Sequence, residues 1–308
     1  MAFRNMRIWR YIEEVARVGS VRQAAERLNV TPSALLRRIQ DAEHDLGAPI
    51  FERSVTGVRP TQAGQILIQW IRNQDAELRR VFSHVEELKG LQRGDVRIAC
   101  SQAVARSFLL QEIRTMREAY PFVKYHVSVM DHNSAMQALI NYDIDLVLIF
   151  KPHLTAELRV VTSTGQRLVA IMAHDHPLAG SSSVRLRECM DYPIALPDRN
   201  FGGREIIEQR LVTSSMEMDV ALEANSFDLL ADFVLDSQAI TFQIEIGSLL
   251  CQADPRWAVR PISDADTPYG PLVLGYLKGR NLPLATAKFS EQLARSLDAL
   301  RTLPLVEN

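Results

Sequence analysis

The stretch AAERLNVTPSAL, residues 24–35, decides the fold of the N-terminal part of this chain. Ala24 and Ala25 are small, so the helix that carries them can approach another helix closely. Leu28-Asn29-Val30 has the composition of a tight turn, because asparagine tolerates the left-handed backbone that such a turn needs. Thr31 is a favourable N-cap and Pro32 fits the first position of a helix. The stretch therefore predicts two helices joined by a tight turn.

A further helix is expected before this pair. Four apolar residues recur at helical spacing and predict it, namely Ile8, Tyr11, Ile12 and Val15. This first helix should end at Gly19, and Ser20 with Gln23 has the spacing of a capping box that opens the second. Gly47 should end the third helix.

The third helix is expected to present two different faces. Its core face is predicted to hold Leu35, Ile39, Ala42 and Leu46. Small hydroxyl and arginine side chains near a helix N-terminus suit base edges in the major groove and the flanking phosphates. The residues of this helix predicted to contact DNA are Thr31, Pro32, Ser33, Arg37, Arg38 and Gln40.

After the third helix, residues 51–53 and 58–60 flank a turn at Gly57 and predict a hairpin that acts as a wing. Arg53 and Arg59 would then lie at phosphate or minor-groove distance. Residues 1–62 hold ten Lys/Arg and seven Asp/Glu, a balance of +3 in a chain of net charge −2. A mildly basic N-terminal part fits DNA binding. Spacing alone leaves open a helix pair without a DNA role, with its arginines as an ordinary solvated surface.

The residues from Ala24 to Gly64 resemble a known family. AAERLNVTPSAL, LGAPIFER (residues 46–53) and TQAG (residues 61–64) match, in order and without a gap, the N-terminal domain of LysR-type transcriptional regulators. The resemblance implies a winged helix-turn-helix that reads double-stranded DNA. Leu36 departs from it, since the family usually has a DNA-contacting serine there; Ala42 replaces a usual leucine, and Val55-Thr56 replaces a usual basic residue.

Residues 62–91 are expected to form one long linker helix, because Gly64 and Gly90 enclose a stretch without glycine or proline. Its apolar positions alternate in steps of four and three, as in a coiled coil, with one polar member: Leu67, Ile71, Gln74, Leu78, Val81, Val85 and Leu88. The alternative is a helix packed on its own domain. The family uses this helix to dimerise, so the resemblance implies a homodimer or homotetramer that places two reading helices on an inverted repeat.

Residues 92–308 alternate apolar strand patterns with helical ones, which predicts an α/β fold. We expect two lobes, with lobe I over about 92–163 and 268–304 and lobe II over about 164–267. The chain should cross between them near Thr162-Ser163-Thr164, and Ser134 with Gln137 should open the helix after the second strand. The order of Gly94–Ile98, Tyr120-Pro121, Ile144–Leu146 and His176–Ala179 resembles the effector domain of the same family, which is similar to periplasmic binding proteins.

Ligands in such lobes lie at strand C-termini and helix N-termini, where backbone N–H groups favour anions. The candidate effector-binding residues at these places are Ser101, Gln102, Ala103, Asn133, Ser134, Phe150, Lys151, Asn200, Phe201, Gly202, Arg204 and Ser226. Lys151 and Arg204 would favour an anionic effector, whereas Ser134 and Ser226 could equally be helix caps. No cofactor is expected beyond a small-molecule effector, and the sequence identifies neither that molecule nor the regulated genes.

Other classes of protein are disfavoured. No apolar run is long enough to span a bilayer and the N-terminus lacks the apolar core of a secretory signal, so a cytoplasmic protein without a membrane partner is expected. An enzyme would need an arranged nucleophile or metal cluster, and His174-Asp175-His176 reads as a polar loop. Two alternatives stay open: a solute-binding protein without a DNA role, and a redox-sensing regulator that uses Cys100, Cys189 or Cys251.

Overall fold

The computed structural model describes residues 6–55, 57–87, 93–152, 155–199, 202–214, 218–263 and 270–302. The chain divides into two compact units between Val81 and Phe82. We refer to the unit that ends at Val81 as the head and to the unit that begins at Phe82 as the body. The division falls inside one long helix, α4 (Gln62–Glu87), and not at either end of the linker that the sequence predicted.

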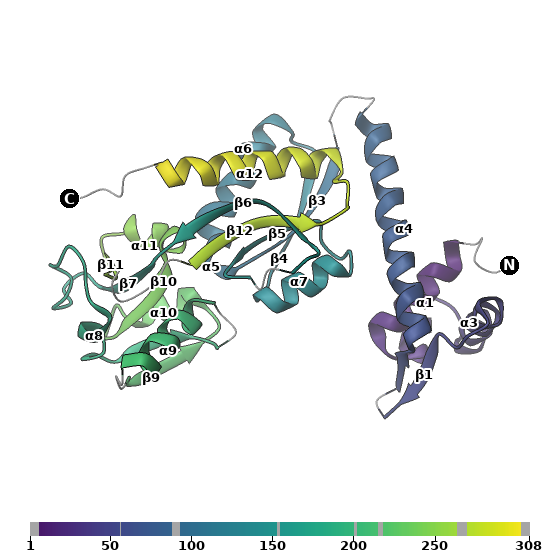
Figure 1. Ribbon diagram of the computed structural model, residues 1–308, viewed down its shortest axis with the longest axis horizontal. Helices are drawn as coiled ribbons and strands as arrows, with labels where there is room; N and C mark the ends of the chain where they lie inside the picture. Colours follow the sequence, from purple (N-terminus) through teal and green to yellow (C-terminus); the bar gives the residue numbers. More distant parts are fainter. Residues whose placement is uncertain are drawn as a thin grey trace. The chain divides into compact units, whose positions relative to one another are not determined.

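The head consists of three short helices, a hairpin and the first part of α4 (Figure 1). Its elements before α4 are α1 (Met6–Val18), α2 (Val21–Leu28), α3 (Pro32–Leu46), β1 (Phe51–Ser54) and β2 (Gly57–Pro60). The capping residues stand where the sequence predicted them. Ser20 Oγ accepts a hydrogen bond from the Gln23 N–H, and Thr31 Oγ1 accepts one from the Ala34 N–H. Asn29 and Gly47 have φ values of 54° and 73°, the left-handed conformation that ends α2 and α3.

The core face of α3 is confirmed over most of its length. Leu35, Ile39 and Ala42 are buried, as predicted. Leu46 was expected beside them but is 38% exposed, because it is the last residue of the helix and lies beyond the stretch that the core covers.

The wing and α4 are fixed to the rest of the head by two close backbone approaches. The Val58 N–H donates to the Gly19 carbonyl oxygen at 2.8 Å, and a Cβ at Gly57 would lie 2.2 Å from that oxygen. A Cβ at Gly64, in the first turn of α4, would lie 2.0 Å from the carbonyl oxygen of Ile50. Real Cβ atoms do not tolerate such distances, so these two positions require glycine.

The body contains two five-stranded mixed sheets, one in each lobe. In lobe I the strand order is β4-β3-β5-β12-β6, with β3 parallel to β4 and β5 and β12 antiparallel to β5 and β6. Its strands are β3 (Gly94–Cys100), β4 (Val123–Val129), β5 (Leu146–Phe150), β6 (Leu158–Gln166) and β12 (Gly270–Leu277). Its helices are α5 (Gln102–Val104), the π-helical turn η2 (Ala105–Leu109), α6 (Leu110–Ala119), α7 (His132–Ile140) and α12 (Leu284–Thr302).

In lobe II the strand order is β11-β7-β10-β8-β9, with β7 antiparallel to β10 and β11 and β8 parallel to β9 and β10. Its strands are β7 (Leu168–Ala173), β8 (Ile194–Pro197), β9 (Val220–Ala224), β10 (Ile240–Ile244) and β11 (Trp257–Pro261). Its helical segments are α8 (Leu186–Cys189), α9 (Gly202–Ser214), α10 (Phe227–Phe233), η3 (Glu245–Ser248) and α11 (Leu249–Gln252).

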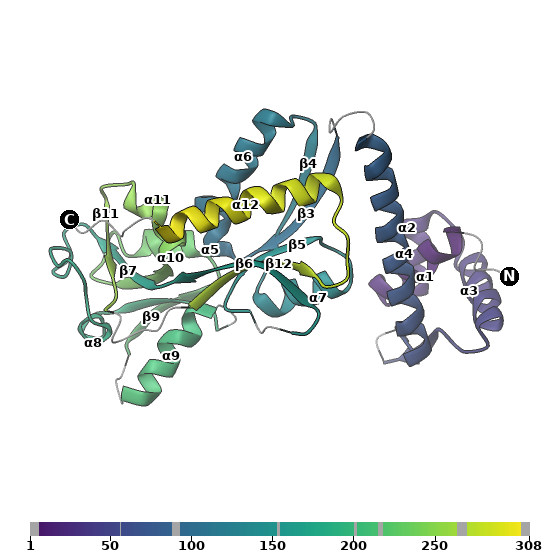
Figure 2. The ribbon, with the colours of Figure 1, turned by 45° about the horizontal axis from the view of Figure 1, so that its top comes forward.

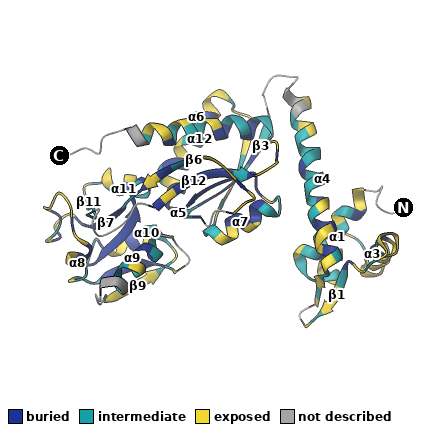
Figure 3. Cartoon of the chain, in the orientation of Figure 1, coloured by how far each residue is buried: buried dark blue, intermediate teal, exposed yellow. Residues whose placement is uncertain are grey.

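Helices cover both faces of each sheet (Figure 2). In lobe I, α12 packs Phe289 and Leu293 onto one face, and α7 packs Ala135 and Leu139 onto the other. The central strands of both sheets, such as β5 in lobe I and β7 and β10 in lobe II, are the most deeply buried elements of the body (Figure 3). Among the helices that the structure describes, none is both long and apolar enough to cross a membrane.

The chain leaves lobe I later than the sequence predicted. Thr162-Ser163-Thr164 lies inside β6 and pairs with β12, and the chain passes to lobe II at Arg167, between β6 and β7. Strands β6 and β11 were not predicted. Both are edge strands with mixed burial, so neither shows a clean apolar pattern in the sequence.

The start of α7 also differs from the prediction. Asp131, and not Ser134, is its N-cap, because Asp131 Oδ1 accepts hydrogen bonds from the Asn133 and Ser134 N–H groups, both at 3.0 Å. The helix therefore begins three residues before the position that the predicted Ser134–Gln137 capping box implied.

Candidate DNA-binding face and candidate ligand sites

The exposed face of α3 carries the polar residues that the sequence predicted. Ser33, Arg37 and Gln40 are exposed and share one side of the helix, opposite the buried Leu35 and Ile39. Arg38 is exposed beside them. Pro32 and Thr31 are exposed at the N-terminus of the helix, where the Thr31 hydroxyl accepts the capping hydrogen bond at 3.3 Å. Within the described residues, no carboxylate pairs with Arg37 or Arg38, so both charges are available to a ligand.

Leu36 lies at the edge of this polar face, between Gln40 and the buried Ile39 around the helix. It is 45% exposed. A leucine on a solvated helix surface does not contribute to a buried apolar core. Its neighbours one helical turn away are Ser33 and Gln40. The face thus offers an apolar contact at one edge, beside a hydroxyl and an amide group.

The two arginines of the wing differ in their charge environment. Glu52 lies directly across the hairpin from Arg59, and their side chains form an ion pair of 2.8 Å between Arg59 Nε and Glu52 Oε1. Arg53 is exposed on the opposite side of the same strand, and the part of the chain that the structure describes gives it no carboxylate partner. Arg53 is therefore the stronger candidate for a phosphate contact.

Three of the predicted effector-binding residues meet at the boundary between the lobes. Ser101, Ala103 and Phe150 of lobe I line a cavity of about 30 Å³ together with Pro197 and Gly203 of lobe II. The Ser101 hydroxyl already accepts a hydrogen bond from the Phe150 N–H at 3.0 Å. A space of this volume holds about one water molecule. The strand ends converge as expected, but in this arrangement they leave no room for an organic ligand.

The two cations on which the expectation of an anionic effector depends are both paired with carboxylates. Lys151 Nζ lies 3.0 Å from Glu205 Oε2 of lobe II. Arg204 is only 3% exposed, and its guanidinium contacts Glu208 at 2.7 Å and Glu223 at 3.2 Å. The cations are neutralised within the protein, so the anionic character of the predicted site is not supported by these residues.

Asn133, Ser134 and Ser226 line neither the small cavity nor the larger one described below. Ser134 Oγ donates to Asp131 Oδ2 at 2.6 Å, and Asn133 is exposed beside it. Ser226 is the N-cap of α10. Asn200 and Phe201 lie outside the described residues, and Gly202 is described only as the first residue of α9. For Ser226 the capping alternative is correct.

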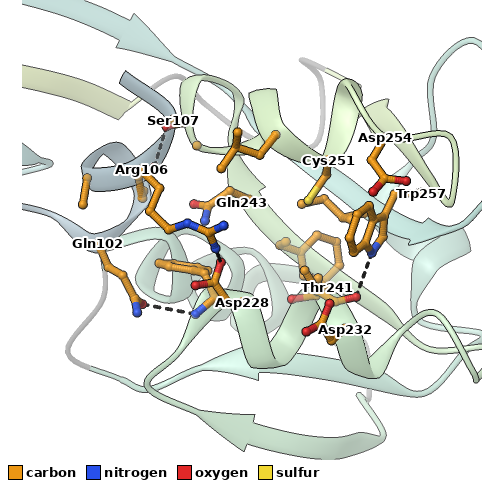
Figure 4. A pocket seen from close by; sticks show the side chains of 18 of the residues that line it. Gln102, Arg106, Ser107, Asp228, Asp232, Thr241, Gln243, Cys251, Asp254 and Trp257 are labelled. Atoms are coloured by element: carbon orange, nitrogen blue, oxygen red, sulfur yellow. Dashed lines mark hydrogen bonds and ion pairs between the residues drawn. The ribbon is translucent and has the colours of Figure 1, made fainter. Parts of the chain in front are cut away.

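A much larger cavity, of about 540 Å³, lies beside the small one (Figure 4). Lobe I contributes Gln102, Ala103 and Arg106 to its wall, and lobe II contributes residues of α10, β10 and α11. Two contacts join the lobes at its edge: Gln102 Oε1 accepts a hydrogen bond from the Phe227 N–H at 3.2 Å, and Arg106 forms an ion pair with Asp228. Of the predicted residues, only Gln102 and Ala103 line this cavity. The other residues that line the cavity belong to separate helices and strands, and the sequence pattern gives no sign that they come together.

Two of the three candidate cysteines, Cys100 and Cys251, are poorly suited to redox chemistry. Burial raises the pKa of the Cys100 thiol to about 12. Burial, together with the carboxylates of Asp228, Asp232 and Asp254, raises the pKa of Cys251 to about 11. Because the thiolate is the reactive form, both thiols are unreactive near neutral pH.

The predicted polar loop is present after β7, with His174 and Asp175 exposed, but His176 is buried and has a structural role. It is 5% exposed, and its Nδ1 accepts a hydrogen bond from the Leu178 N–H at 3.1 Å, so Nε2 carries the proton and donates to the Gln238 carbonyl oxygen at 3.2 Å. Burial lowers the pKa of His176, which favours this neutral ring. Across the described ranges no three His, Cys, Asp or Glu side chains gather in a way that could hold a metal ion.

Comparisons with known proteins match both units. The family model described as "Bacterial regulatory helix-turn-helix protein, lysR family" matches residues 6–65, and the one described as "LysR substrate binding domain" matches residues 89–298. The RuBisCO operon transcriptional regulator of Allochromatium vinosum is 28% identical over 205 residues, 67% of this chain and 68% of that protein. A probable nitrogen assimilation transcriptional activator of Synechococcus elongatus is 23% identical over 253 residues, 81% of this chain and 82% of that protein.

Two solved structures share the fold. A full-length OxyR variant from Pseudomonas aeruginosa has a TM-score of 0.67 at 18% identity, and the match covers 95% of this chain and 94% of that chain. Full-length CbnR complexed with its target DNA has a TM-score of 0.64 at 17% identity, covering 95% of this chain and 99% of that chain.

The pKa values of the thiols predict slow alkylation of the folded protein. At pH 7 the thiolate fraction of Cys251 should be roughly 300-fold below that of a free cysteine of pKa about 8.5, and the iodoacetamide rate should rise about tenfold for each pH unit up to pH 9. Mass spectrometry of tryptic peptides measures this rate, with the guanidinium-unfolded chain as the control. Alkylation of native Cys251 or Cys100 at the rate of the unfolded chain would reopen the redox alternative.

Proposed function

The chain belongs to the LysR family of bacterial transcription regulators, and we propose that its head reads operator DNA through the exposed face of α3 and the wing, under the control of a small molecule bound by the body. No catalytic role is proposed. Since its target is DNA, the cytoplasm is its proposed location.

The observation that carries the DNA-reading proposal is the unpaired charge on α3. Arg37 and Arg38 are exposed and have no carboxylate partner in the described part of the chain, while Ser33 and Gln40 stand beside them as hydrogen-bonding groups for base edges. Thr31 is occupied as the helix cap, so its contribution is to fix the N-terminus of α3. Arg53 of the wing adds a phosphate contact.

The body is proposed to transmit ligand binding through the contacts between its lobes. Gln102 with Phe227, Arg106 with Asp228 and Lys151 with Glu205 are polar contacts that join lobe I to lobe II. A ligand that favours one arrangement of the lobes over another shifts the population toward it. Polar contacts of this kind are weak enough for a ligand to change them.

We also propose that α4 pairs with a second copy of the chain through its C-terminal half. The coiled-coil pattern of α4 forms an apolar seam, and its first residues, Leu67 and Ile71, are buried in the head's own core. This part of the helix therefore packs on its own domain, which was the alternative to a coiled coil. Val81, Phe82 and Val85 are 50%, 63% and 46% exposed. Apolar residues clustered on one helix in this way are typical of a surface that another chain covers. A dimer would give the regulator two reading helices for an inverted repeat.

The double variant Arg37→Ala, Arg38→Ala should bind operator DNA about 10- to 100-fold more weakly, and its affinity should depend less on salt because phosphate contacts are lost. Fluorescence anisotropy with a fragment from upstream of the protein's own gene, at several salt concentrations, measures both effects. Arg114→Ala, an exposed arginine of α6 in the body, is the control and should leave binding unchanged. Unchanged affinity in the double variant would show that the reading face lies elsewhere.

Leu36 should contact the C5-methyl group of one thymine in the operator, since an apolar side chain in the major groove reads that methyl group. Replacing that thymine by deoxyuridine should weaken binding of the wild-type protein about fourfold, the value of one buried methyl group at about 0.8 kcal/mol. The same replacement should leave the affinity of Leu36→Ala unchanged. Deoxyuridine scanning of the operator with both proteins tests this. Identical penalties for the two proteins at every thymine would refute the contact.

Val85→Glu should convert the assembly into monomers, because it places a charge in the proposed seam. Multi-angle light scattering of the full chain gives the mass. Gln65→Glu adds a charge to an exposed position of the same helix and should leave the mass of the wild type unchanged. A monomeric wild-type protein, or an unaltered mass for Val85→Glu, would show that α4 does not pair with a second copy of the chain through this surface.

A further inference from the structure

The 540 Å³ cavity has the size of a small-molecule site and adjoins the small cavity at the strand ends, with which it shares Ala103, Phe227, Phe242 and Gln243. It lies on the face of the lobe II sheet that α10 covers, where Val169, Ile171 and Leu230 form a cluster of their own. Helix α10, α11 and the π-helical turn η2 enclose it, so both lobes contribute to the wall (Figure 4).

The sheet side of the cavity holds a hydroxyl group without a partner. Thr241 is 2% exposed, and its Oγ1 makes no hydrogen bond within the described residues. Thr241 pairs with Ile171 on β7, and both line the cavity, so strand alternation directs the threonine side chain toward this face of the sheet. A buried hydroxyl without a partner is unfavourable, and a ligand oxygen at this place would satisfy it.

Gln243 lies two residues further along the same strand and is 6% exposed. Its Oε1 accepts a hydrogen bond from the Ile244 N–H at 2.9 Å. The described residues offer no acceptor to its amide NH2 group. Thr241 and Gln243 together present donors to an oxygen atom of a ligand.

The mouth of the cavity carries an excess of negative charge. Three carboxylates line it, those of Asp228, Asp232 and Asp254. Arg106 pairs with Asp228, and Arg256 pairs with Asp254 at 2.9 Å. Asp232 makes no ion pair among the residues that the structure describes, although the Arg256 guanidinium is near enough to interact with it electrostatically. All three carboxylates act on Cys251, since each raises the pKa of that thiol, so their fields overlap inside the cavity.

Between the hydroxyl and the carboxylates the wall is apolar and aromatic, with Phe227, Leu250 and Trp257. Trp257 is held in place, because its Nε1 donates to the Ala231 carbonyl oxygen at 2.9 Å and the Arg256 guanidinium lies over its ring at 4.5 Å. A flat apolar body fits between these side chains.

We propose that this cavity binds a small organic amine, with its ammonium group on Asp232, its apolar body against Trp257 and Phe227, and an oxygen atom at the far end on Thr241 and Gln243. The proposal rests on the proposed function only in treating the body as the ligand-binding part of a regulator. It replaces the anionic ligand that Lys151 and Arg204 had indicated, because those cations are already paired.

Three probes that share a phenol and differ in one end group test the charge: tyramine, 4-(2-hydroxyethyl)phenol and 3-(4-hydroxyphenyl)propanoate. In isothermal titration calorimetry with the full chain, tyramine should bind at least tenfold more tightly than the neutral probe, and the anionic probe should bind most weakly. Asp232→Asn should weaken tyramine binding about tenfold, the effect of removing a charged hydrogen-bond partner. Asp236→Asn, at an exposed position just after α10, is the matched control and should change nothing.

A second variant tests the other end of the ligand. Thr241→Val keeps the shape of the side chain, so it should weaken binding of tyramine but not of 2-phenylethylamine, which lacks the phenol oxygen. Thermal unfolding verifies that each variant is folded. The proposal is overturned if tyramine gives no binding heat at millimolar concentration, if the anionic probe binds best, or if Asp232→Asn leaves tyramine binding unchanged. Operator binding measured on the same samples separates the two proposals, since a lost ligand site with intact, salt-sensitive DNA binding leaves the regulator function standing.

Discussion

The head depends on the close approach of α4 to the segment between α3 and the wing. At Gly64 the backbone of α4 lies so near the Ile50 carbonyl oxygen that a Cβ there would lie 2.0 Å from it. Ile50 is itself held by Glu43 of α3, whose Oε1 accepts hydrogen bonds from the Ile50 and Phe51 N–H groups at 2.8 and 3.2 Å. The linker helix, the reading helix and the wing are thereby joined through a few backbone atoms, so the reading face has a fixed geometry.

The same approach determines what α4 has left for assembly. Because its first turns pack onto the head, Leu67, Ile68 and Ile71 complete a core that also contains Ile8 and Ile12 of α1. The apolar seam in the sequence is continuous, but its two halves have different uses. Only the half that includes Val81 and Val85 remains exposed. A single periodic pattern thus combines an internal core contact with a surface for another chain.

The proposed DNA-binding face and the proposed ligand site differ in whether their charged side chains are already paired within the protein. A cation serves a ligand only when no carboxylate of the protein already neutralises it, since an ion pair that must be broken offsets the new contact. Arg37 and Arg38 on α3 meet this condition, and Arg204 in the body does not. In the large cavity the balance is reversed, because three carboxylates line it against only two guanidinium groups, those of Arg106 and Arg256. The head is therefore suited to phosphates, and the cavity to an amine.

The sequence by itself determined the elements whose signals are local. Helix caps at Ser20, Thr31 and Gly47, and the alternation of strands and helices in the body, follow from contacts within a few residues, and the structure places them as predicted. The edge strands β6 and β11 were not predicted, because their mixed burial leaves no regular period of apolar residues in the sequence. Only the tertiary structure decided the ligand sites. Lys151 meets Glu205 and Arg204 meets Glu223 through contacts between distant segments, and the large cavity exists because η2, α10 and α11 come together without filling the space between them. Local spacing carries no information on such meetings, so the sequence predicted the exposed polar face of α3 but could not show that the charges of its candidate effector residues Lys151 and Arg204 are already paired.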